Sequence, residues 1–434
     1  MKPGRSLLSL SSSGPTTQEG VAATGGLGAA LSHLVGRRLA AALGDAPVSL
    51  VLPHGEEVRA SDRAPVARVV FRDPGALFGL IGPWRELHFG EAYGAGRIEI
   101  EGDFLAFLEA TYLAPGLSGP FDRLAARWRG IMRRRNTLRG ARENVHHHYD
   151  LGNDFYTLWL DREMVYTCAY FPSAEATLEE AQLAKMEHVC RKLGLRPGET
   201  VVEAGCGWGS LALYMARRHG VRVRAFNISH EQVAWARERA EREGLAGQVE
   251  FVEDDYRNVA GRYDAFASVG MLEHVGPEHY RDLSRVIDRT LAADGRGLLH
   301  FIGRNRPVEF SPFVQRHIFP GAYAPTLREA ADVLEPARLS VLDVENLRLH
   351  YARTLEDWLA RFESHRDEIA RRFDDRFVRI WRLYLAGSVA GFRTGALQLF
   401  QVLFARERSN AIPRTRSHLY TDAEREAGWS AATS

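Results

Sequence analysis

The sequence predicts an α/β protein whose larger domain is an open, mostly parallel β-sheet. From about residue 177, short apolar segments alternate with segments of helical period, the order that crossover connections in a parallel sheet require. A glycine-rich run, Glu203–Gly209, follows the first of these strands and opens a helix. Glycines at that junction let the backbone approach a ligand beside the unpaired N–H groups of the helix. We therefore expect a ligand at the carboxyl ends of the strands, at a topological switch point.

Each element of this domain is predicted from its local pattern. A helix is expected over Thr177–Leu193, another at about Ser210–Arg218, a third from Ser229, whose partner Gln232 completes a capping-box pattern, and a fourth at about Glu278–Leu291. The predicted strands are Val201–Ala204, Arg222–Phe226, Val249–Glu253, Tyr263–Val269 and Gly297–Ile302. The C-terminal third is predicted to be helical, with two apolar stripes, Leu355, Trp358, Leu359, Phe362, Ile369, Phe373 and then Phe377, Ile380, Trp381, Tyr384, Leu385. Such stripes are usually core, although they could also cover a long apolar ligand.

The chain before this domain divides into three parts. Residues 1–28, rich in Ser, Gly and Thr, are expected to be a disordered tail, and residues 29–126 a small α+β domain. Residues 127–143 form an Arg-rich linker, either a solvated helix or a basic segment that meets anionic lipid headgroups. The catalytic domain is expected over 144–408 and a C-terminal tail over 409–434. Within the small domain we predict strands at 48–52, 67–71 and 97–102, and helices at 77–81 and 104–112.

Composition narrows the classes of function. The 434 residues are 45% hydrophobic and 26% charged, which suits a globular protein of two or three domains and excludes collagen, coiled coil or full disorder. The 56 basic and 55 acidic residues leave a net charge of +1, which gives no support to a nucleic-acid binder. Only three residues are lysine, so lysine-based catalysis is not expected. Three cysteines fit a reducing compartment, and no apolar run is long enough for a membrane span. We expect a cytoplasmic protein.

The glycine-rich run is the strongest local signal. It lacks the Gly-Lys-Ser/Thr of a phosphate loop and is tighter than a dinucleotide fingerprint. It resembles motif I of class I S-adenosylmethionine-dependent methyltransferases. That fold often carries an acidic residue after the second strand for the ribose hydroxyls, whereas this chain has Asn227, with Ser229 and Gln232 nearby. Asp254, Asp255 and Tyr256 follow the third strand, either as adenine contacts or as simple N-caps.

An ordered set of motifs extends this resemblance. The set comprises His147–Tyr156, Tyr166–Phe171, the glycine-rich run, Ile228–Gln232, Val269–Gly276, His300–Gly303 and Gln398–Phe404. From about residue 144 to 408 the chain resembles cyclopropane-fatty-acyl-phospholipid synthases and the related mycolic acid cyclopropane synthases. The resemblance implies a Rossmann-like, seven-stranded, mostly parallel sheet with helical lipid-binding insertions. It also implies transfer of a methylene group from S-adenosylmethionine to the cis double bond of unsaturated phospholipid acyl chains.

The resemblance assigns roles to individual residues. The base in this family is thought to be a bound bicarbonate ion, held by the catalytic residues Cys168, Glu273, His300, Ile302 and Tyr351. Cys168 and Ile302 would donate backbone N–H groups, and Glu273 would accept the proton of the ion. Cofactor contacts are implied for Tyr166, Thr167, Glu203, Gly205, Cys206, Gly207, Gly209, Asn227, Ser229, Gln232, Asp255 and Tyr256. Substrate-lining positions are implied for His148, Tyr149, Tyr170 and Phe171.

Other interpretations of these residues stay open. Glu273 could begin a helix, His300 could be a core histidine and Tyr351 a packing residue. His146-His147-His148 suggests a metal, but consecutive histidines cannot converge on one ion, so no metal is expected. A methylene- or methyl-branched product, or a lipid-binding protein without catalysis, are the alternatives to ring closure. The expected partners are unsaturated phospholipids and an anionic membrane surface, with the protein peripheral to the inner face of the membrane. Members of the family are commonly homodimers.

Overall fold

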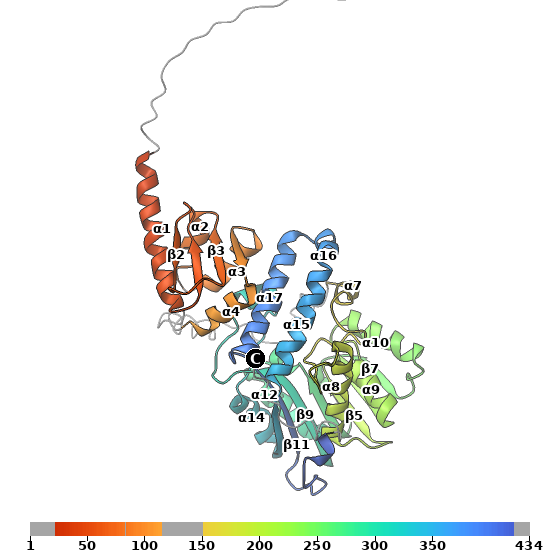
Figure 1. Ribbon diagram of the computed structural model, residues 1–434. Helices are drawn as coiled ribbons and strands as arrows, with labels where there is room; N and C mark the ends of the chain where they lie inside the picture. The colour runs from red at the N-terminus through yellow and green to blue at the C-terminus, as the bar shows by residue number, and fades with distance from the viewer. Residues whose placement is uncertain (1–21, 83, 115–150, 421–434) are drawn as a thin grey trace, which may run out of the picture.

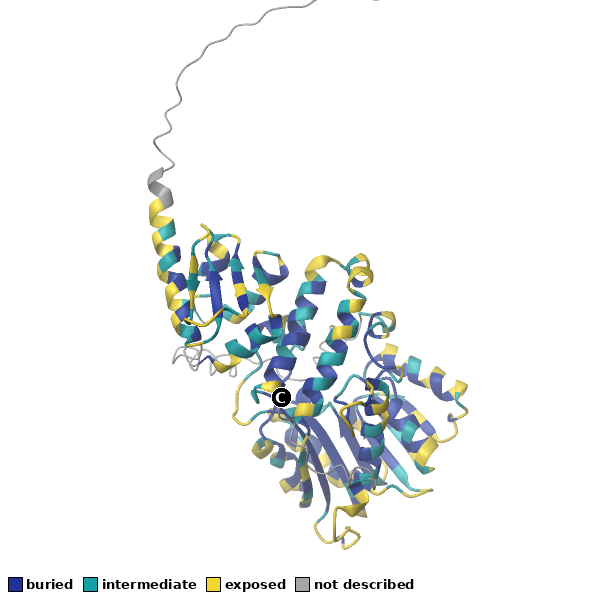
Figure 2. Ribbon diagram, viewed as in Figure 1, coloured by how far each residue is buried: buried dark blue, intermediate teal, exposed yellow. Residues whose placement is uncertain are grey.

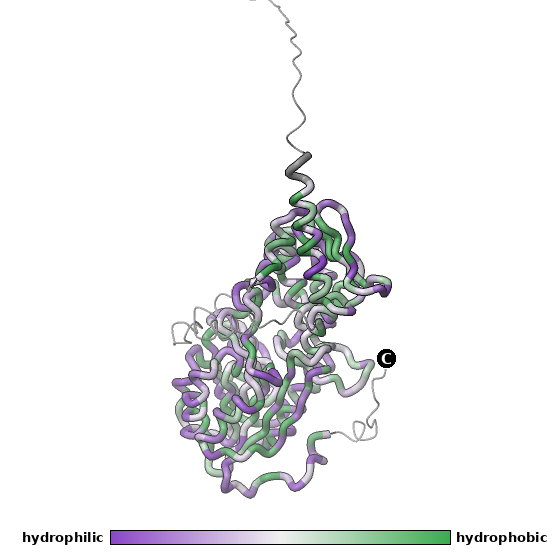
Figure 3. The backbone as a smooth tube through the Cα atoms, turned by 90° about the vertical axis from the view of Figure 1, so that its left-hand side faces the viewer, coloured by the Kyte–Doolittle hydropathy of each residue, from purple (hydrophilic) through white to green (hydrophobic). Residues whose placement is uncertain are grey.

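The computed structural model describes residues 22–82, 84–114 and 151–420, which form a small domain and a larger domain. The small domain is stacked on one end of the larger one, as the two perpendicular views show (Figures 1 and 3). The Arg-rich linker 127–143, together with His148 and Tyr149, lies outside the described residues. Among the described helices, none combines the length and apolarity needed to cross a membrane.

A seven-stranded sheet in the order β10-β11-β9-β8-β5-β6-β7 forms the centre of the larger domain. Its strands are buried along most of their length (Figure 2). The strands β5 to β9 are mutually parallel, and the chain order reverses at β5, so the segment after β5 lies at the switch point. Their bounds are β5 Thr200–Ala204, β6 Arg222–Asn227, β7 Val249–Glu253, β8 Tyr263–Val269 and β9 Leu291–Gly303. The predicted parallel sheet is confirmed.

The helices that connect these strands also match the predicted order. The helices near the sheet are α7 Asn153–Tyr156, α8 Leu178–Leu193, α9 Ser210–His219, α10 His230–Arg242, α11 Leu272–Val275, α12 Tyr280–Thr290, α13 Pro312–His317 and α14 Leu327–Leu334. Short 3-10 turns occur at Tyr256–Asn258, Pro277–His279 and Glu335–Ala337. Thr177 caps α8 in a reciprocal capping box with Glu180, and Ser229 caps α10 through the N–H of Gln232.

Two strands of this sheet were not predicted. The strands β10 Leu339–Asn346 and β11 Gln398–Arg406 lie in the C-terminal third, which was expected to be helical. The strand β11 runs antiparallel between β9 and β10 and is buried on both faces, so its sequence shows no polar alternation. The expectation of an all-helical C-terminal third was wrong because a doubly buried strand and a buried helical turn have the same apolar pattern.

The small domain is a four-stranded sheet, β2-β1-β3-β4, with helices packed against it. Its elements are α1 Ala22–Leu43, β1 Val48–Val51, β2 Glu57–Arg59, β3 Ala67–Phe71, α2 Pro74–Phe78, α3 Arg85–Gly94, β4 Ile98–Gly102 and α4 Phe104–Leu113. The predicted strands are confirmed. The tail expected over 1–28 overlaps α1 Ala22–Leu43, and residues 1–21 lie outside the described residues. The helix expected at 77–81 begins earlier, at Pro74, where the Asp73 side chain accepts the N–H of Ala76 as the N-cap.

Three C-terminal helices join the two domains. They are α15 Arg348–Ser364, α16 Arg366–Arg372 and α17 Asp375–Arg393, and they rise beside the small domain (Figure 1). The helix α17 packs against α15, α3 and α4. Arg379 on α17 stacks 4.2 Å above the ring of Tyr93 and pairs with Glu99 at 3.1 Å. The predicted apolar stripes therefore pack not only on the sheet but also on the small domain.

The C-terminal segment expected as a tail from residue 409 contacts the larger domain as far as residue 420. A short 3-10 turn, Ser417–Leu419, places Leu419 in a buried position at 2% exposure. Arg416 forms an ion pair with Asp343 on β10. The sequence offered little sign of this contact because it depends on one leucine in an otherwise polar segment, and the boundary at residue 409 stays a prediction.

Candidate active site

A cavity of about 180 Å³ lies at the switch point of the sheet, where the glycine-rich run connects β5 to α9. Gly205, Gly207 and Gly209 have φ values of +84°, +53° and +85°, which side-chain-bearing residues rarely adopt. The N–H groups of Gly205 and Cys206 both bond to the carbonyl of Phe226, which fixes the loop against β6. The loop therefore forms a backbone cradle at the cavity.

Ten of the twelve predicted cofactor residues line this cavity. They are Tyr166, Thr167, Glu203, Gly205, Cys206, Gly207, Asn227, Gln232, Asp255 and Tyr256. The Asn227 amide donates to the carbonyl of Gly207 at 3.1 Å and to the Gln232 side chain at 2.8 Å, so it ties two sides of the cavity together. Asp255 holds the guanidinium of Arg257 through both carboxylate oxygens. Within residues 22–82, 84–114 and 151–420, a buried carboxylate oxygen of Glu203 and the Tyr256 hydroxyl have no hydrogen-bond partner, which suits a polar ligand.

Gly209 and Ser229 do not line the cavity. A Cβ on Gly209 would lie 2.6 Å from the Phe251 ring and 2.9 Å from the Ala236 side chain, so this glycine permits close packing of α9 on its neighbours. The Ser229 hydroxyl is the N-cap of α10. Both residues support the walls of the cavity without facing it.

Lys185 is a cavity residue that the sequence did not reveal. It lies on α8, is 2% exposed, and its Nζ donates to the Thr167 hydroxyl at 2.9 Å. Burial lowers the pKa of Lys185 to about 8, and burial raises the pKa of the neighbouring Glu203 carboxyl to about 7. The scarcity of lysine argued against lysine chemistry, whereas this lysine places a buried amine beside the cofactor residues.

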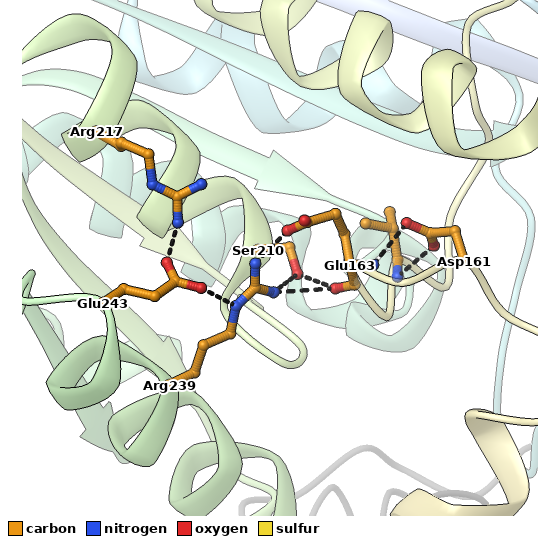
Figure 4. A network of polar contacts seen from close by, with 7 residues as sticks. Asp161, Glu163, Ser210, Arg217, Arg239 and Glu243 are labelled. Carbon is orange, nitrogen blue, oxygen red and sulfur yellow. Dashed lines mark hydrogen bonds and ion pairs between the residues drawn. The ribbon is translucent and has the colours of Figure 1, made fainter.

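A polar network anchors the loop that carries Tyr166 and Thr167. Arg239 of α10 pairs with both Glu163 and Glu243, and it also donates to the Ser210 hydroxyl at 3.2 Å (Figure 4). Asp161 accepts the N–H groups of Glu163 and Val165 at 3.0 and 2.9 Å. These contacts fix the loop to the first residue of α9 and to α10, so the cofactor cavity keeps its shape without a ligand.

A second, larger cavity of about 470 Å³ adjoins the first. The two share the residues Tyr166, Thr167, Gly270 and His274. Most of the second cavity is apolar, and its wall comes from both domains. The small domain contributes, among others, Leu39, Leu43, Leu50, Val69, Phe71, Phe89, Phe107 and Leu108, and the larger domain contributes Phe319, Leu355, Leu383, Tyr384, Phe392 and Leu397. A long apolar ligand can therefore lie across both domains with part of its length beside the cofactor cavity.

Glu273 places a carboxyl group in the wall of this second cavity. It lies on α11, and its Oε1 accepts the backbone N–H of Ile302 at 2.7 Å. Its Oε2 is buried and has no hydrogen-bond partner among the residues that the structure describes. Burial raises the pKa of Glu273 to about 7, so the group can change protonation state near neutral pH. Ile302 and Tyr351 also line this cavity, as the implied roles require.

His300 and Cys168 lie behind this wall. The Gln401 amide donates to Nδ1 of His300 at 3.0 Å, which leaves the proton of the neutral ring on Nε2. This buried atom has no hydrogen-bond partner within the described part of the chain. Burial lowers the pKa of His300 well below its usual range, so the ring is neutral. The Cys168 thiol donates to the carbonyl of Ala169 at 3.1 Å, and burial raises its pKa. The thiol is therefore inert, and any role of Cys168 is that of its backbone.

The structure places Tyr170 and Phe171 outside both cavities. Tyr170 stacks between His188 and His350, with ring centroids 4.4 and 4.8 Å apart, and Phe171 packs under the Arg353 guanidinium at 4.4 Å. The backbone after Cys168 turns away from the sheet because Phe171 N–H bonds to His350 on α15 at 3.0 Å. Neither residue lines these two cavities, and their substrate-lining role stays a prediction. Among the aromatic residues that do line the large cavity, Tyr166 and Tyr384 join their hydroxyls at 2.7 Å.

Comparison with known proteins identifies the family. A sequence model of the mycolic acid cyclopropane synthetase family matches residues 136–402, more than half of the chain. The chain belongs to this family. Its family and its fold show that the chain is an S-adenosylmethionine-dependent methyltransferase. The glycine-rich cradle and the unpartnered polar atoms of the smaller cavity fit that cofactor.

The relatives of this chain are named for different reactions. A "probable fatty acid methyltransferase" of Pseudomonas putida is 35% identical over 82% of this chain and 92% of its own. The cyclopropane-fatty-acyl-phospholipid synthase of Escherichia coli K12 is 41% identical over 61% of this chain and 68% of its own. A crystal structure of the mycolic acid cyclopropane synthase CmaA1 complexed with SAH and CTAB matches with a TM-score of 0.58 and 29% identity, covering 61% of this chain and 98% of that one.

Proposed function

We propose that the protein transfers a methylene group from S-adenosylmethionine to the cis double bond of unsaturated acyl chains in membrane phospholipids, forming cyclopropane fatty acids. The observation that carries this proposal is the position of Glu273. Its carboxyl lies in the wall of an apolar cavity that adjoins the cofactor cavity through Tyr166, Thr167, Gly270 and His274. A carboxyl in a mostly apolar wall beside the cofactor cavity suits a residue that would hold the base for a carbocation.

The proposed reaction balances in two steps. Bound S-adenosylmethionine would supply an electrophilic methyl group and leave as S-adenosylhomocysteine, and bicarbonate would supply the base. The methyl would become bonded to one alkene carbon, with the positive charge on the other alkene carbon. Loss of one proton from the new methyl to the base would close the second carbon–carbon bond. The mostly apolar wall would limit contact of the cation with water, and the rings of Tyr166 and Tyr384, which line the same cavity, would be available for cation–π contact.

The residues beside this cavity suit a small oxyanion. Neither Glu273 Oε2 nor the protonated Nε2 of His300 has a hydrogen-bond partner in the described part of the chain, and such buried polar atoms are rare unless a ligand bonds to them. Glu273 already accepts the Ile302 N–H, which orients its carboxyl. Glu273 and His300 would orient the base, and Tyr351 would contribute its hydroxyl from the cavity wall.

A membrane surface would deliver the acyl chain to the small domain. Three large apolar side chains, Ile81, Trp84 and Leu113, are 58%, 47% and 68% exposed. Each is next in sequence to a residue of the cavity wall. Ile81 follows Leu80, Trp84 precedes Arg85, and Leu113 lies between Tyr112 and Ala114. Exposed apolar groups at a lipid cavity favour contact with a bilayer over contact with water. We propose that this side of the small domain meets the inner face of the membrane.

A methyl- or methylene-branched product is the second candidate. The 35% identity to the Pseudomonas putida protein over most of both chains favours it, since that relative is named a fatty acid methyltransferase. The two products differ in which proton leaves the cation. Glu273 and His300 beside the cavity favour loss from the new methyl, and hence ring closure.

The experiment that tests the proposal uses purified full-length protein, methyl-labelled S-adenosylmethionine and vesicles of an unsaturated phospholipid. Mass spectrometry of the acyl chains should show the gain of one CH₂ in a form that resists mild hydrogenation as a ring. An exocyclic methylene or a methyl branch would refute ring closure and support the second candidate. If lipid and cofactor bind but no label is transferred, the result would refute the proposed activity and support a lipid-binding protein without catalysis.

A further inference from the structure

A row of polar side chains crosses the central sheet on the face that α8 covers. In the antiparallel pairs of β9, β10 and β11, His300 lies directly opposite Gln401, and Gln401 lies directly opposite Glu345. Directly opposite residues of neighbouring strands project from the same face of a sheet. His300 also shares its side of β9 with Ile302, whose N–H holds Glu273, because alternate residues of a strand point the same way. The row therefore runs from the outer strand β10 to the wall of the large cavity.

The helix α8 fixes the outer end of this row and sets the charge of its inner end. The Glu345 carboxylate accepts from Nε2 of His188 and from Nζ of Lys192, both at 2.7 Å. Burial lowers the pKa of His300 well below its usual range, and the charges of Lys185 and Lys192 on α8 lower it further. The His300 ring is therefore neutral and carries a single N–H, whereas an imidazolium would donate from both nitrogens.

Gln401 determines which nitrogen of that neutral ring carries the proton. Its side chain is 0% exposed, and its amide Nε2 lies 3.0 Å from Nδ1 of His300. An amide nitrogen can only donate, so Nδ1 accepts and the proton stays on Nε2. Among the residues that the structure describes, this is the one hydrogen bond of the His300 side chain, so it also holds the plane of the ring.

We propose that Gln401 is a positioning residue for the transfer reaction, holding His300 in the form whose Nε2–H donates to an oxyanion beside Glu273. This inference rests on the proposed function, and it adds a residue that acts only through His300. Without a donor at position 401, Nδ1 loses its partner, and the ring can turn or move its proton to the other nitrogen. Gln401 lines neither cavity, so its loss should lower the rate and leave the binding of lipid and cofactor unchanged.

The kinetic test compares Gln401→Met, which removes the donor at similar volume, with Gln398→Met. Gln398 is a matched control because it is a buried glutamine of the same strand whose amide donates to the carbonyl of Gly395, and its odd spacing from Gln401 places it on the other face. On dioleoyl phospholipid vesicles, we expect Gln401→Met to lower kcat about 5- to 50-fold. KM for the lipid and the affinity for S-adenosylhomocysteine should stay within about twofold of the wild type. Gln398→Met should retain the kcat of the wild type.

A double variant tests whether Gln401 acts through His300. The side chain in His300→Gln offers an amide N–H that needs no particular tautomer. In that background, Gln401→Met should change kcat by less than about twofold, because the bond that it removes is already absent. Nitrogen NMR of histidine-labelled protein supplies a readout that does not depend on activity. The His300 signals, assigned by their absence in His300→Gln, should show Nε2 protonated and Nδ1 accepting in the wild type, and Nδ1 without that hydrogen bond in Gln401→Met.

Four results would overturn the positioning role. They are a wild-type His300 protonated on Nδ1; an unchanged kcat in Gln401→Met; equal losses in Gln401→Met and Gln398→Met, which would mean a general cost of altering the strand; and additive losses in the double variant, which would mean that Gln401 acts apart from His300. If the wild type transfers no label to any unsaturated phospholipid, the proposed function fails on its own account. The NMR spectra then still decide on Gln401, since identical His300 signals in the wild type and Gln401→Met would refute the inference.

Discussion

The substitution Glu273→Gln should abolish turnover and at the same time stabilise the protein in alkaline solution. Burial raises the pKa of this carboxyl from 4.5 to about 7. In the folded protein the group keeps its proton up to about pH 7, whereas the unfolded chain loses it near pH 4.5. The unfolded state therefore binds fewer protons between these values, and stability falls as the pH rises through this window.

The size of the effect follows from the same two values. A difference of about 2.5 pH units at about 1.4 kcal/mol each costs the wild type about 3 kcal/mol above pH 7. Glutamine carries no ionisable group, and its amide oxygen can still accept the Ile302 N–H. We expect Glu273→Gln to exceed the wild type in free energy of unfolding by about 3 kcal/mol at pH 8 and by about 1 kcal/mol or less at pH 5.

Urea denaturation at both pH values measures this difference, with Glu231→Gln as an exposed control that should change neither stability nor activity. Because all other titrating groups are common to both proteins, the difference between them isolates Glu273. Label transfer from methyl-labelled cofactor reports activity, and calorimetry with S-adenosylhomocysteine shows that the cofactor site is intact. A stability difference that does not change with pH, or full turnover in Glu273→Gln, would refute the reasoning.

Three further substitutions test other parts of the structure. Lys185→Met should weaken cofactor binding about 5- to 50-fold by calorimetry, because Thr167 loses its buried donor; unchanged affinity would show that the lysine only fills space. Gly209→Ala should lower the free energy of unfolding by about 2–4 kcal/mol in thermal denaturation, because its methyl would meet Phe251 and Ala236. Gly207→Ala has open space around the new methyl but a positive φ, so it should chiefly weaken cofactor binding. The reverse pattern would contradict the placement of these two glycines. Leu50→Phe should shift preference toward shorter acyl chains in a competition between chain lengths, and an unchanged product ratio would place the chain elsewhere.

The fold of the larger domain was predictable where local pattern and tertiary environment agree. The strands Val249–Glu253 and Tyr263–Val269 have the predicted bounds because each is a short apolar run ended by charged or glycine residues. The strand Gln398–Arg406 escaped prediction because its pairing with Leu291–Gly303 joins segments about 100 residues apart. The helix Arg85–Gly94 was also missed, since it gains its stability from packing on α17 and α13.

The site was predictable only where a motif fixes it. Glu273 and the glycine-rich run lie where their motifs indicated. Lys185 was missed because one buried lysine in a helix has no sequence signature. Tyr170 does not line either cavity, because a motif gives the order of residues, whereas the direction of a side chain depends on its contacts with α15 and α8. The Ser229 hydroxyl caps α10, since a hydroxyl can bond to a helix end as well as to a ligand. The roles predicted for both residues stay predictions.

The wall of the large cavity has a consequence for how this enzyme can diverge. Leu50, Val69 and Phe71 are core residues of the small domain at 3%, 2% and 2% exposure, and they also face the cavity. A mutation at any of them therefore changes two properties at once, the stability of that domain and the range of lipids accepted. Lineages adapting to a new membrane composition would thus retain only substitutions that satisfy both demands. Mutant libraries intended to alter lipid preference should accordingly randomise these positions together, so that a change in the shape of the cavity can be combined with compensating packing in the core of the small domain.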